Sequence, residues 1–195
     1  MYKSKKTSLV ISICFIFTML LTACSSSSSG SAGSNDTKKS DVMAAYNKVS
    51  LGMTKEQVDK ALGLAPKEET SELALKNTFN YTDSNTGYGV SVVYNSSNIV
   101  YSKTAVYNTH KDIAPLCKKS VNESQKEKIS KGMSYDEVVN ILGGDGVEAS
   151  VTASEKSPTE IIGVIRRWAN SDGSGFQIVF SKDNKVENVL YFDHD

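Results

Sequence analysis

The sequence has few of the residues that cross-link a fold or supply common catalytic groups. It contains three cysteines and two histidines, and only one cysteine, Cys117, lies beyond the N-terminal 24 residues. No intramolecular disulfide is therefore expected in the region that folds, so packing must hold it together. A reactive cysteine needs a base beside it. Because His110 and His194 are the only histidines, a structural role is favoured for Cys117.

No hydrophobic run is long enough to cross a membrane as a helix. The N-terminal run, residues 9–21, has about 13 residues, whereas a membrane span needs about 20. Three lysines precede this run, and Leu-Thr-Ala-Cys ends it at Cys24. The arrangement is typical of a signal peptide, and its last four residues resemble the lipobox of bacterial lipoproteins. We expect residues 1–23 to be a lipoprotein signal peptide and Cys24 to be lipidated; an ordinary signal peptide with a chance cysteine is the other interpretation.

The rest of the chain has no excess of positive charge. Without Lys3, Lys5 and Lys6, 19 basic residues remain against 22 acidic residues. Nucleic-acid binding needs a concentrated basic surface, and no basic cluster is visible in the sequence. No nucleic-acid partner is therefore expected.

Residues 25–40 contain no apolar residue larger than alanine. Such a segment cannot bury enough surface to offset the entropy cost of ordering. We expect residues 24–40 to be a lipidated cysteine followed by a disordered, Ser-rich tether. The protein would then be lipid-anchored at the extracytoplasmic face of the cell membrane, and the long tether favours a Gram-positive surface.

The main feature after the tether is an internal repeat. VSLGMTKEQVDKALG, from Val49 to Gly63, recurs 80 residues later as ISKGMSYDEVVNILG, from Ile129 to Gly143. Each copy contains an N-cap hydroxyl, a capping box, an apolar helix face and a final glycine, which together predict a short helix. The caps are Thr54 with Gln57 and Ser134 with Glu137, and the preceding helices would cover 42–49 and 124–129.

Strand patterns follow each helix motif. Segments rich in β-branched and aromatic residues are separated by Asp, Ser, Asn and Gly turns. In the middle segment of each copy, alternate residues should face the helices. The expected strands are 73–81, 90–94 and 99–107 in the first copy, and 161–168, 176–180 and 186–192 in the second; the residues expected to face the helices are Val90, Val92, Tyr94, Phe176, Ile178 and Phe180.

These patterns predict an α+β fold of two tandem repeats, residues 41–116 and 117–195. A unit of about 75 residues can only marginally bury a core by itself. We therefore expect the two helix-helix-sheet repeats to join in one antiparallel sheet with the helices on one face, which leaves the other face open.

The repeated motif also resembles a known family. GMTKEQVDKALG and GMSYDEVVNILG are similar to the paired signatures of the β-lactamase-inhibitor-protein-like family and, more distantly, of the SmpA/OmlA type of small envelope lipoprotein. Residues 176–193 resemble the family's closing hairpin, so the resemblance covers most of 42–193. It implies a concave joined sheet that presents aromatic residues to a protein partner. In the inhibitor, this surface and its turns grip a secreted β-lactamase.

The resemblance implies a set of outward protein-binding residues. Interface energy concentrates in large aromatic residues and arginine. The other interpretation of each aromatic residue is an ordinary core position. The implied residues are Phe79, Tyr81, Asp83 and Tyr88 in the first copy, and Arg166, Trp168 and Tyr191 in the second.

No catalytic site can be assembled from the sequence. There is no G-x-S-x-G segment, and residues 143–146 lack the Lys-Ser/Thr of a phosphate loop. We expect a non-enzyme without catalytic residues, cofactor or metal, whose partner is an extracellular or periplasmic protein such as a class A β-lactamase. The membrane would be contacted only through the lipid anchor. The alternative is a structural envelope-assembly or cell-surface lipoprotein of SmpA/OmlA type without inhibitory activity; an uncharacterised hydrolase ranks last.

Overall fold

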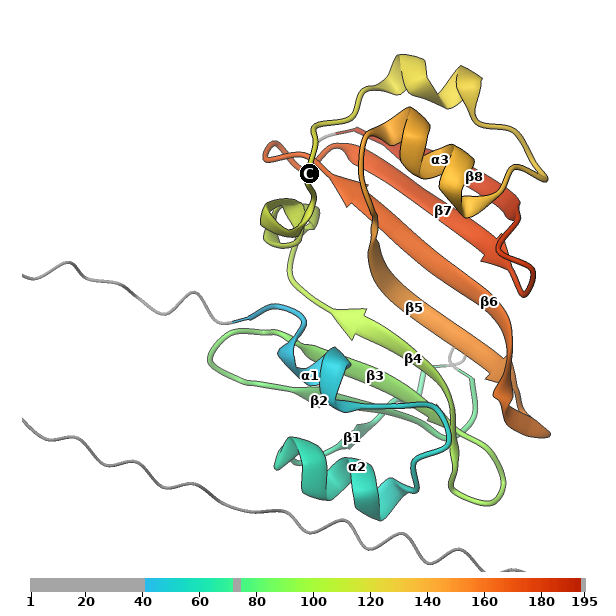
Figure 1. Cartoon of the computed structure of the whole chain (residues 1–195). Helices are drawn as coiled ribbons and strands as arrows, with labels where there is room; N and C mark the ends of the chain where they lie inside the picture. Colours follow the sequence, from blue (N-terminus) through green and yellow to red (C-terminus); the bar gives the residue numbers. More distant parts are fainter. Residues whose placement is uncertain (1–40, 72–74, 194–195) are drawn as a thin grey trace, which may run out of the picture. The chain divides into compact units, whose positions relative to one another are not determined.

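Eight strands form one open sheet, in which every neighbouring pair is antiparallel and the strand order follows the sequence (Figure 1). The computed structural model describes residues 41–71 and 75–193; the expected signal peptide, Cys24 and the tether lie outside these residues. The strands are β1 (Lys67–Glu68), β2 (Thr78–Thr82), β3 (Gly89–Tyr94), β4 (Val100–Val106), β5 (Val147–Ser154), β6 (Ser157–Ala169), β7 (Gly175–Ser181) and β8 (Val186–Phe192).

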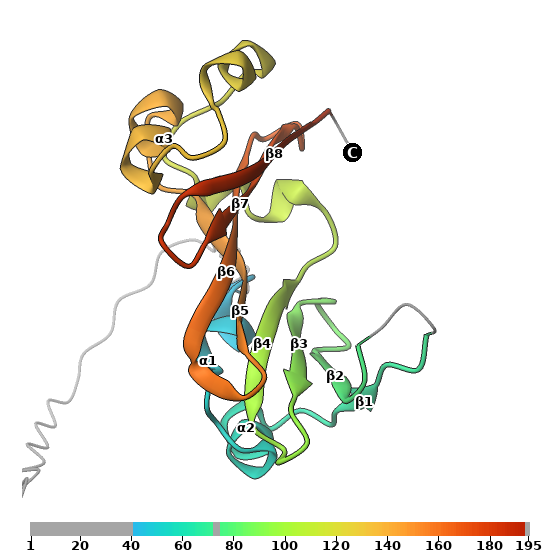
Figure 2. The same cartoon turned by 90° about the vertical axis from the view of Figure 1, so that its right-hand side faces the viewer.

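Helices are fewer and shorter than the expected α+β fold implies, so the sheet dominates the described residues. The α-helices lie on one face of the sheet (Figure 1 and Figure 2). They are α1 (Ala44–Lys48), α2 (Lys55–Leu62) and α3 (Tyr135–Leu142), and the 3-10 helices are η1 (His110–Asp112), η2 (Ala114–Leu116) and η3 (Glu123–Lys128). The expectation of one joined antiparallel sheet is confirmed.

The two repeated motifs fold as the sequence predicts. The Thr54 side chain caps α2 and the Ser134 side chain caps α3, and each forms a capping box with the residue three positions later. Each helix then ends at a glycine in the left-handed conformation, with φ of 63° at Gly63 and 80° at Gly143. A β-carbon is disfavoured in this conformation, which explains the glycine in both copies.

In each half, the same backbone hydrogen bonds connect the turn at the helix start to the last hairpin of that half. Two backbone N–H groups near the helix start donate to carbonyls of that hairpin. The matching bonds are Gly52 to Val100 (2.9 Å) and Gly132 to Val186 (2.8 Å), and Lys55 to Asn98 (3.1 Å) and Tyr135 to Asn184 (3.0 Å). Asn98 and Asn184 both have positive φ, of 57° and 54°.

Two hydrophobic clusters lie between the helices and the sheet, one in each half. The predicted facing of the middle strands is confirmed, because all six side chains expected under the helices are at most 1 % exposed. The first cluster gathers around Val58 of α2 and the second around Val138 of α3, both fully buried. These clusters fix which face of the sheet is covered.

Several element boundaries differ from the expectation. The patterns missed β1, which has two residues, and β5, which is built largely from small side chains. The helix expected at 124–129 is the 3-10 helix η3, and the link between the halves contains η1 and η2. The first expected strand begins later, at Thr78, and residues 72–74 lie outside the description.

Candidate protein-binding surface

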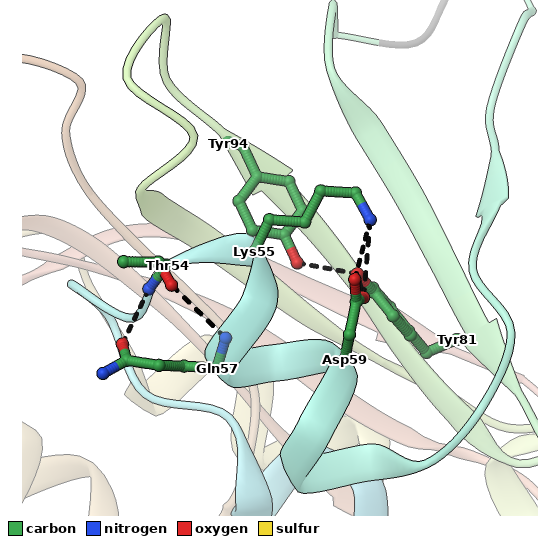
Figure 3. Close-up of polar contacts among 6 residues, drawn as sticks. All are labelled: Thr54, Lys55, Gln57, Asp59, Tyr81 and Tyr94. Carbon is green, nitrogen blue, oxygen red and sulfur yellow. Dashed lines mark hydrogen bonds and ion pairs between the residues drawn. The ribbon is translucent and has the colours of Figure 1, made fainter.

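Tyr81 belongs to a polar and aromatic cluster beneath α2 (Figure 3). Phe79 packs against the same core and is half-buried there, not directed outward as expected. The Tyr81 hydroxyl donates to Oδ1 of Asp59 at 2.7 Å and lies 2.9 Å from the Tyr94 hydroxyl. Since the single proton of Tyr81 is used on Asp59, Tyr94 is the donor to Tyr81. Lys55 forms an ion pair with Asp59 at 3.1 Å and lies over the ring of Phe79. The cluster fastens α2 to β2 and β3.

Burial raises the pKa of both tyrosines. Desolvation raises the pKa of Tyr94 to about 12, and desolvation with the hydrogen bonds to Tyr94 and Asp59 raises the pKa of Tyr81 further above its usual value. Both hydroxyls are therefore neutral donors over the physiological pH range.

Trp168, Arg166 and Tyr191 lie on the helix-bearing side of the second half. Trp168 is 1 % exposed, and its Nε1 donates to the Gly144 carbonyl at 2.7 Å. The Arg166 guanidinium lies over the Tyr135 ring of α3. Tyr191 packs edge-on against Phe176 in the same cluster. The second half therefore directs its large side chains towards its helix.

The outward orientation expected for Tyr81 and Trp168 is wrong. Both side chains are in the core, with exposed fractions of 0 % and 1 %. Their polar atoms suggested solvent contact, but each has a hydrogen-bond partner inside the fold, which removes the cost of burying them. Arg166 and Tyr191 are half-buried on the helix side as well, Arg166 with hydrogen bonds to Gly146 and Glu148 and Tyr191 by packing against Phe176.

Asp83 and Tyr88 lie in the turn between β2 and β3. Asp83 Oδ1 accepts from the N–H of Asn85 at 2.7 Å and of Thr86 at 3.2 Å, which fixes the turn. The Tyr88 hydroxyl is hydrogen-bonded to Asp112 of the link between the halves; burial, followed by this bond, raises the Tyr88 pKa. The turn lines a cavity of about 200 Å³ with residues of α1 and the end of α2, which is smaller than most ligand pockets.

The opposite side of the sheet, here called the open face, has a different composition. Because paired residues of neighbouring strands share a face, the register defines two rows that cross the sheet. The first row is Lys67, Asn80, Ser91, Thr104, Ser150, Ile165, Val179 and Asn188, and the second is Thr78, Val93, Ser102, Thr152, Gly163 and Ser181.

Of these fourteen residues only Lys67, on the edge strand, is charged, in a chain of which 23 % of residues are charged. Small hydroxyl and β-branched side chains predominate instead. Depletion of charge is a property of the buried centres of protein interfaces. Thr78, Val93, Ser102 and Ser150 are at most 8 % exposed, so the other members of the rows form the accessible surface. That surface has the composition of an interface centre, without the aromatic residues that the family resemblance implied.

The two halves meet on the open face through hydroxyl groups. At the pairing of β4 with β5, Ser102 contacts Thr152 at 2.8 Å and Thr104 contacts Ser150 at 2.9 Å, hydroxyl to hydroxyl. These bonds join the rows of the first half to those of the second. The open face is consequently continuous across the junction.

On the helix side, the junction is held by a buried lysine. Lys103 Nζ donates to the carbonyls of Tyr46 at 3.1 Å and Val49 at 2.7 Å, which lie at the end of α1. The Tyr46 hydroxyl donates to Glu148 of β5 at 2.9 Å. Burial lowers the pKa of Lys103 and raises that of Tyr46. Helix α1 is thus attached to both halves.

The link between the halves lies against one end of the open face. The Arg167 guanidinium donates to the hydroxyl of Tyr107. The ring centroids of His110 and Phe192 are 4.0 Å apart. Register places Arg167 beside Gln177 on the open-face side of the sheet. This end is therefore partly covered and carries the only arginine of that face among the described residues.

Three further features of the described residues concern a thiol, metal-binding groups and helix length. Cys117 lines a cleft with lysines and small polar residues, and burial raises the pKa of its thiol, which leaves the unreactive thiol form. Within residues 41–71 and 75–193, no group of acidic residues, histidines and cysteines could hold a metal ion. No helix in that part of the chain is long and apolar enough to cross a membrane.

Comparison with known proteins found no matching family model and no matching curated protein.

Proposed function

We propose that the chain is an extracytoplasmic lipoprotein that binds another protein through its open face. The signal sequence and Cys24 support export and lipid anchoring, and the Ser-rich residues 25–40 would separate the folded unit from the membrane. The observation that carries the binding proposal is the continuous pair of rows on the open face, which is uncharged from β2 to β8.

We also infer that the unit consists of two tandem repeats, residues 41–116 and 117–195, each with a capped helix and four antiparallel strands. The matched helix caps and the matched bonds from turn to hairpin support this interpretation. Side-by-side packing of the repeats extends the open face to twice the width of one unit, towards the area of a standard protein interface.

The binding proposal is tested by placing a charge at the centre of the open face. Thr104 is exposed and lies near the middle of the first row. The mature chain carrying Cys24→Ser should capture a protein from an extracytoplasmic extract, and Thr104→Glu should weaken capture at least 100-fold, because an unpaired charge in an interface costs several kcal/mol.

The matched control is Asn140→Glu on the exposed surface of α3, which should capture the same protein at full strength. Thermal unfolding of both variants would confirm that each is folded. Capture that is equal for Thr104→Glu and Asn140→Glu would refute the open-face site.

A class A β-lactamase is the first partner to test. The buried positions of Tyr81 and Trp168 leave any such contact to the open face and the turn at residues 83–88. Loss of β-lactamase turnover at micromolar protein, abolished by Thr104→Glu, would identify an inhibitor. Unchanged turnover together with capture of another protein would retain the binding proposal and remove the inhibitory one.

A further inference from the structure

The outer edge of β8 differs from the opposite edge of the sheet. No strand of the described residues pairs with the outer side of β8, although its first residue, Val186, is bonded there to Gly132 and Met133. The rest of this edge runs to Phe192 and includes Leu190, 49 % exposed. The other edge is β1, which consists of Lys67 and Glu68 alone. A short, charged edge resists strand addition, whereas a long edge with an exposed apolar residue favours it.

The first half shows how such an edge is used. Strand β4 is the counterpart of β8, and residues Ser102 to Thr104 of β4 pair with β5. Both β4 and β8 carry one extra residue, at Tyr101 and Glu187, just before this stretch. The stretch of β8 that corresponds to 102–104 is Asn188 to Leu190. Helix α1 packs beside β4 without preventing the β5 pairing, so η3 beside β8 leaves the equivalent edge accessible.

We infer that β8 is a docking strand for β8 of a second copy of this chain. An antiparallel pair centred on Val189 places Asn188 of each copy opposite Leu190 of the other, and β8 is the longer of the two sheet edges that a second copy offers among its described residues. A two-fold axis generates such a pair and closes the assembly at two copies. Head-to-tail addition through β1 is excluded by its two-residue length. This inference rests on the proposed repetition of one unit.

The dimer joins two sheets edge to edge and places both open faces on the same side. It is independent of partner capture, since edge-to-edge pairing places nothing over the accessible residues of the open face. A contact of three residues for each chain is small, so association should be weak in dilute solution. Two copies anchored on one membrane would meet at a higher effective concentration.

Mixed cross-linking tests the register of the pair. One mature chain carries Asn188→Cys and another carries Leu190→Cys, both with Cys24→Ser and Cys117→Ser. Opposed β-carbons in an antiparallel pair are about 4.5–5.5 Å apart, close to disulfide range, whereas diagonal neighbours are about 7–8 Å apart. The mixed disulfide should therefore form at least tenfold faster than either like-with-like disulfide. Lys67→Cys mixed with Glu68→Cys should show no such preference.

A second measurement uses sedimentation of the mature chain carrying Cys24→Ser. Leu190→Lys should raise the dimer dissociation constant at least tenfold, and Thr159→Lys, on the exposed part of β6, should leave it unchanged. Equal rates for mixed and like-with-like disulfides, or a monomer at every concentration, would overturn the inference. Cross-linking of Leu190→Cys to a captured protein instead would assign the edge to that protein and overturn the dimer.

Discussion

In the first half of the sheet, two tyrosines and a carboxylate meet beneath α2, whereas the second half fills the equivalent positions with tryptophan, phenylalanine and valine. Tyr94 corresponds to Phe180, and Asp59 of α2 corresponds to Val139 of α3. The helix caps and the bonds from turn to hairpin are nevertheless the same in both halves. The comparison teaches that the repeated motif specifies backbone geometry, while the core beneath it can be polar or apolar if each buried polar group has a partner.

The strongest test of the shared backbone uses one glycine in each half. A β-carbon at Gly89 would overlap with the carbonyl oxygen of Tyr81, and one at Gly175 with that of Trp168. Gly89→Ala and Gly175→Ala should each lower the free energy of unfolding by about 4 kcal/mol or more, because backbone must move. Urea unfolding measures both losses. A mild loss in one variant and a severe loss in the other would break the equivalence of the halves.

Exchanging the core residues tests the difference between the halves. Tyr94→Phe removes one hydrogen bond and should lower the free energy of unfolding by about 1 kcal/mol. Phe180→Tyr adds a hydroxyl to a cluster where Phe180 is 1 % exposed, and should cost about 1–3 kcal/mol unless the hydroxyl finds a partner. Thermal unfolding of both variants provides the comparison. A stabilised Phe180→Tyr variant would show that the second core also accepts a polar group.

The helix caps should contribute equally. Thr54→Ala and Ser134→Ala each remove a side chain that accepts from a backbone N–H of the first helical turn. Each should lower the free energy of unfolding by about 1 kcal/mol. Because the two sites are in different halves, the double variant should lose about the sum. A loss well below the sum would mean that the halves unfold separately.

Alkaline pH should act on the first half through Tyr94, with the smallest effect. The pKa of Tyr94 is raised to about 12, above the value of about 10 in an unfolded chain. The unfolded state therefore releases this proton first, so the stabilisation is complete below pH 10 and is lost as the pH rises towards 12. Between pH 9 and 11, the free energy of unfolding of Tyr94→Phe should fall by about 1 kcal/mol less than that of the unmodified chain. An equal fall in the free energy of unfolding for the two chains would contradict the raised pKa of the Tyr94 hydroxyl.

The sequence predicted the helix motifs because their signals are local. A hydroxyl at the N-cap, an acceptor three residues later and a glycine at the end determine α2 and α3 without reference to the rest of the chain. The middle strands were predicted for a similar reason, because their alternation is regular. Strand β5 was missed since Ala149, Ser150 and Ala153 carry little of the β-branched and aromatic signal.

The facing of the outer strands could not be predicted from the sequence. Alternation shows which residues share a face but not which face is covered. Tyr81 and Trp168 are placed in the core by partners distant in sequence, Asp59 and Gly144. The rows of the open face depend on the register of all eight strands, including the irregular pairing of β5 with β6, so no local pattern could have identified them.

The central claim is that the open face binds a protein partner. Methyl NMR of the mature chain with and without the captured protein tests it directly, since methyl groups distinguish the two faces of one strand. Binding should shift the methyl signals of Ile165 and Val179, which lie side by side on the open face. Signals of Ile141 and Ala61, half-buried on the helix side, should remain unchanged. Shifts confined to Ile141 and Ala61 would contradict the account.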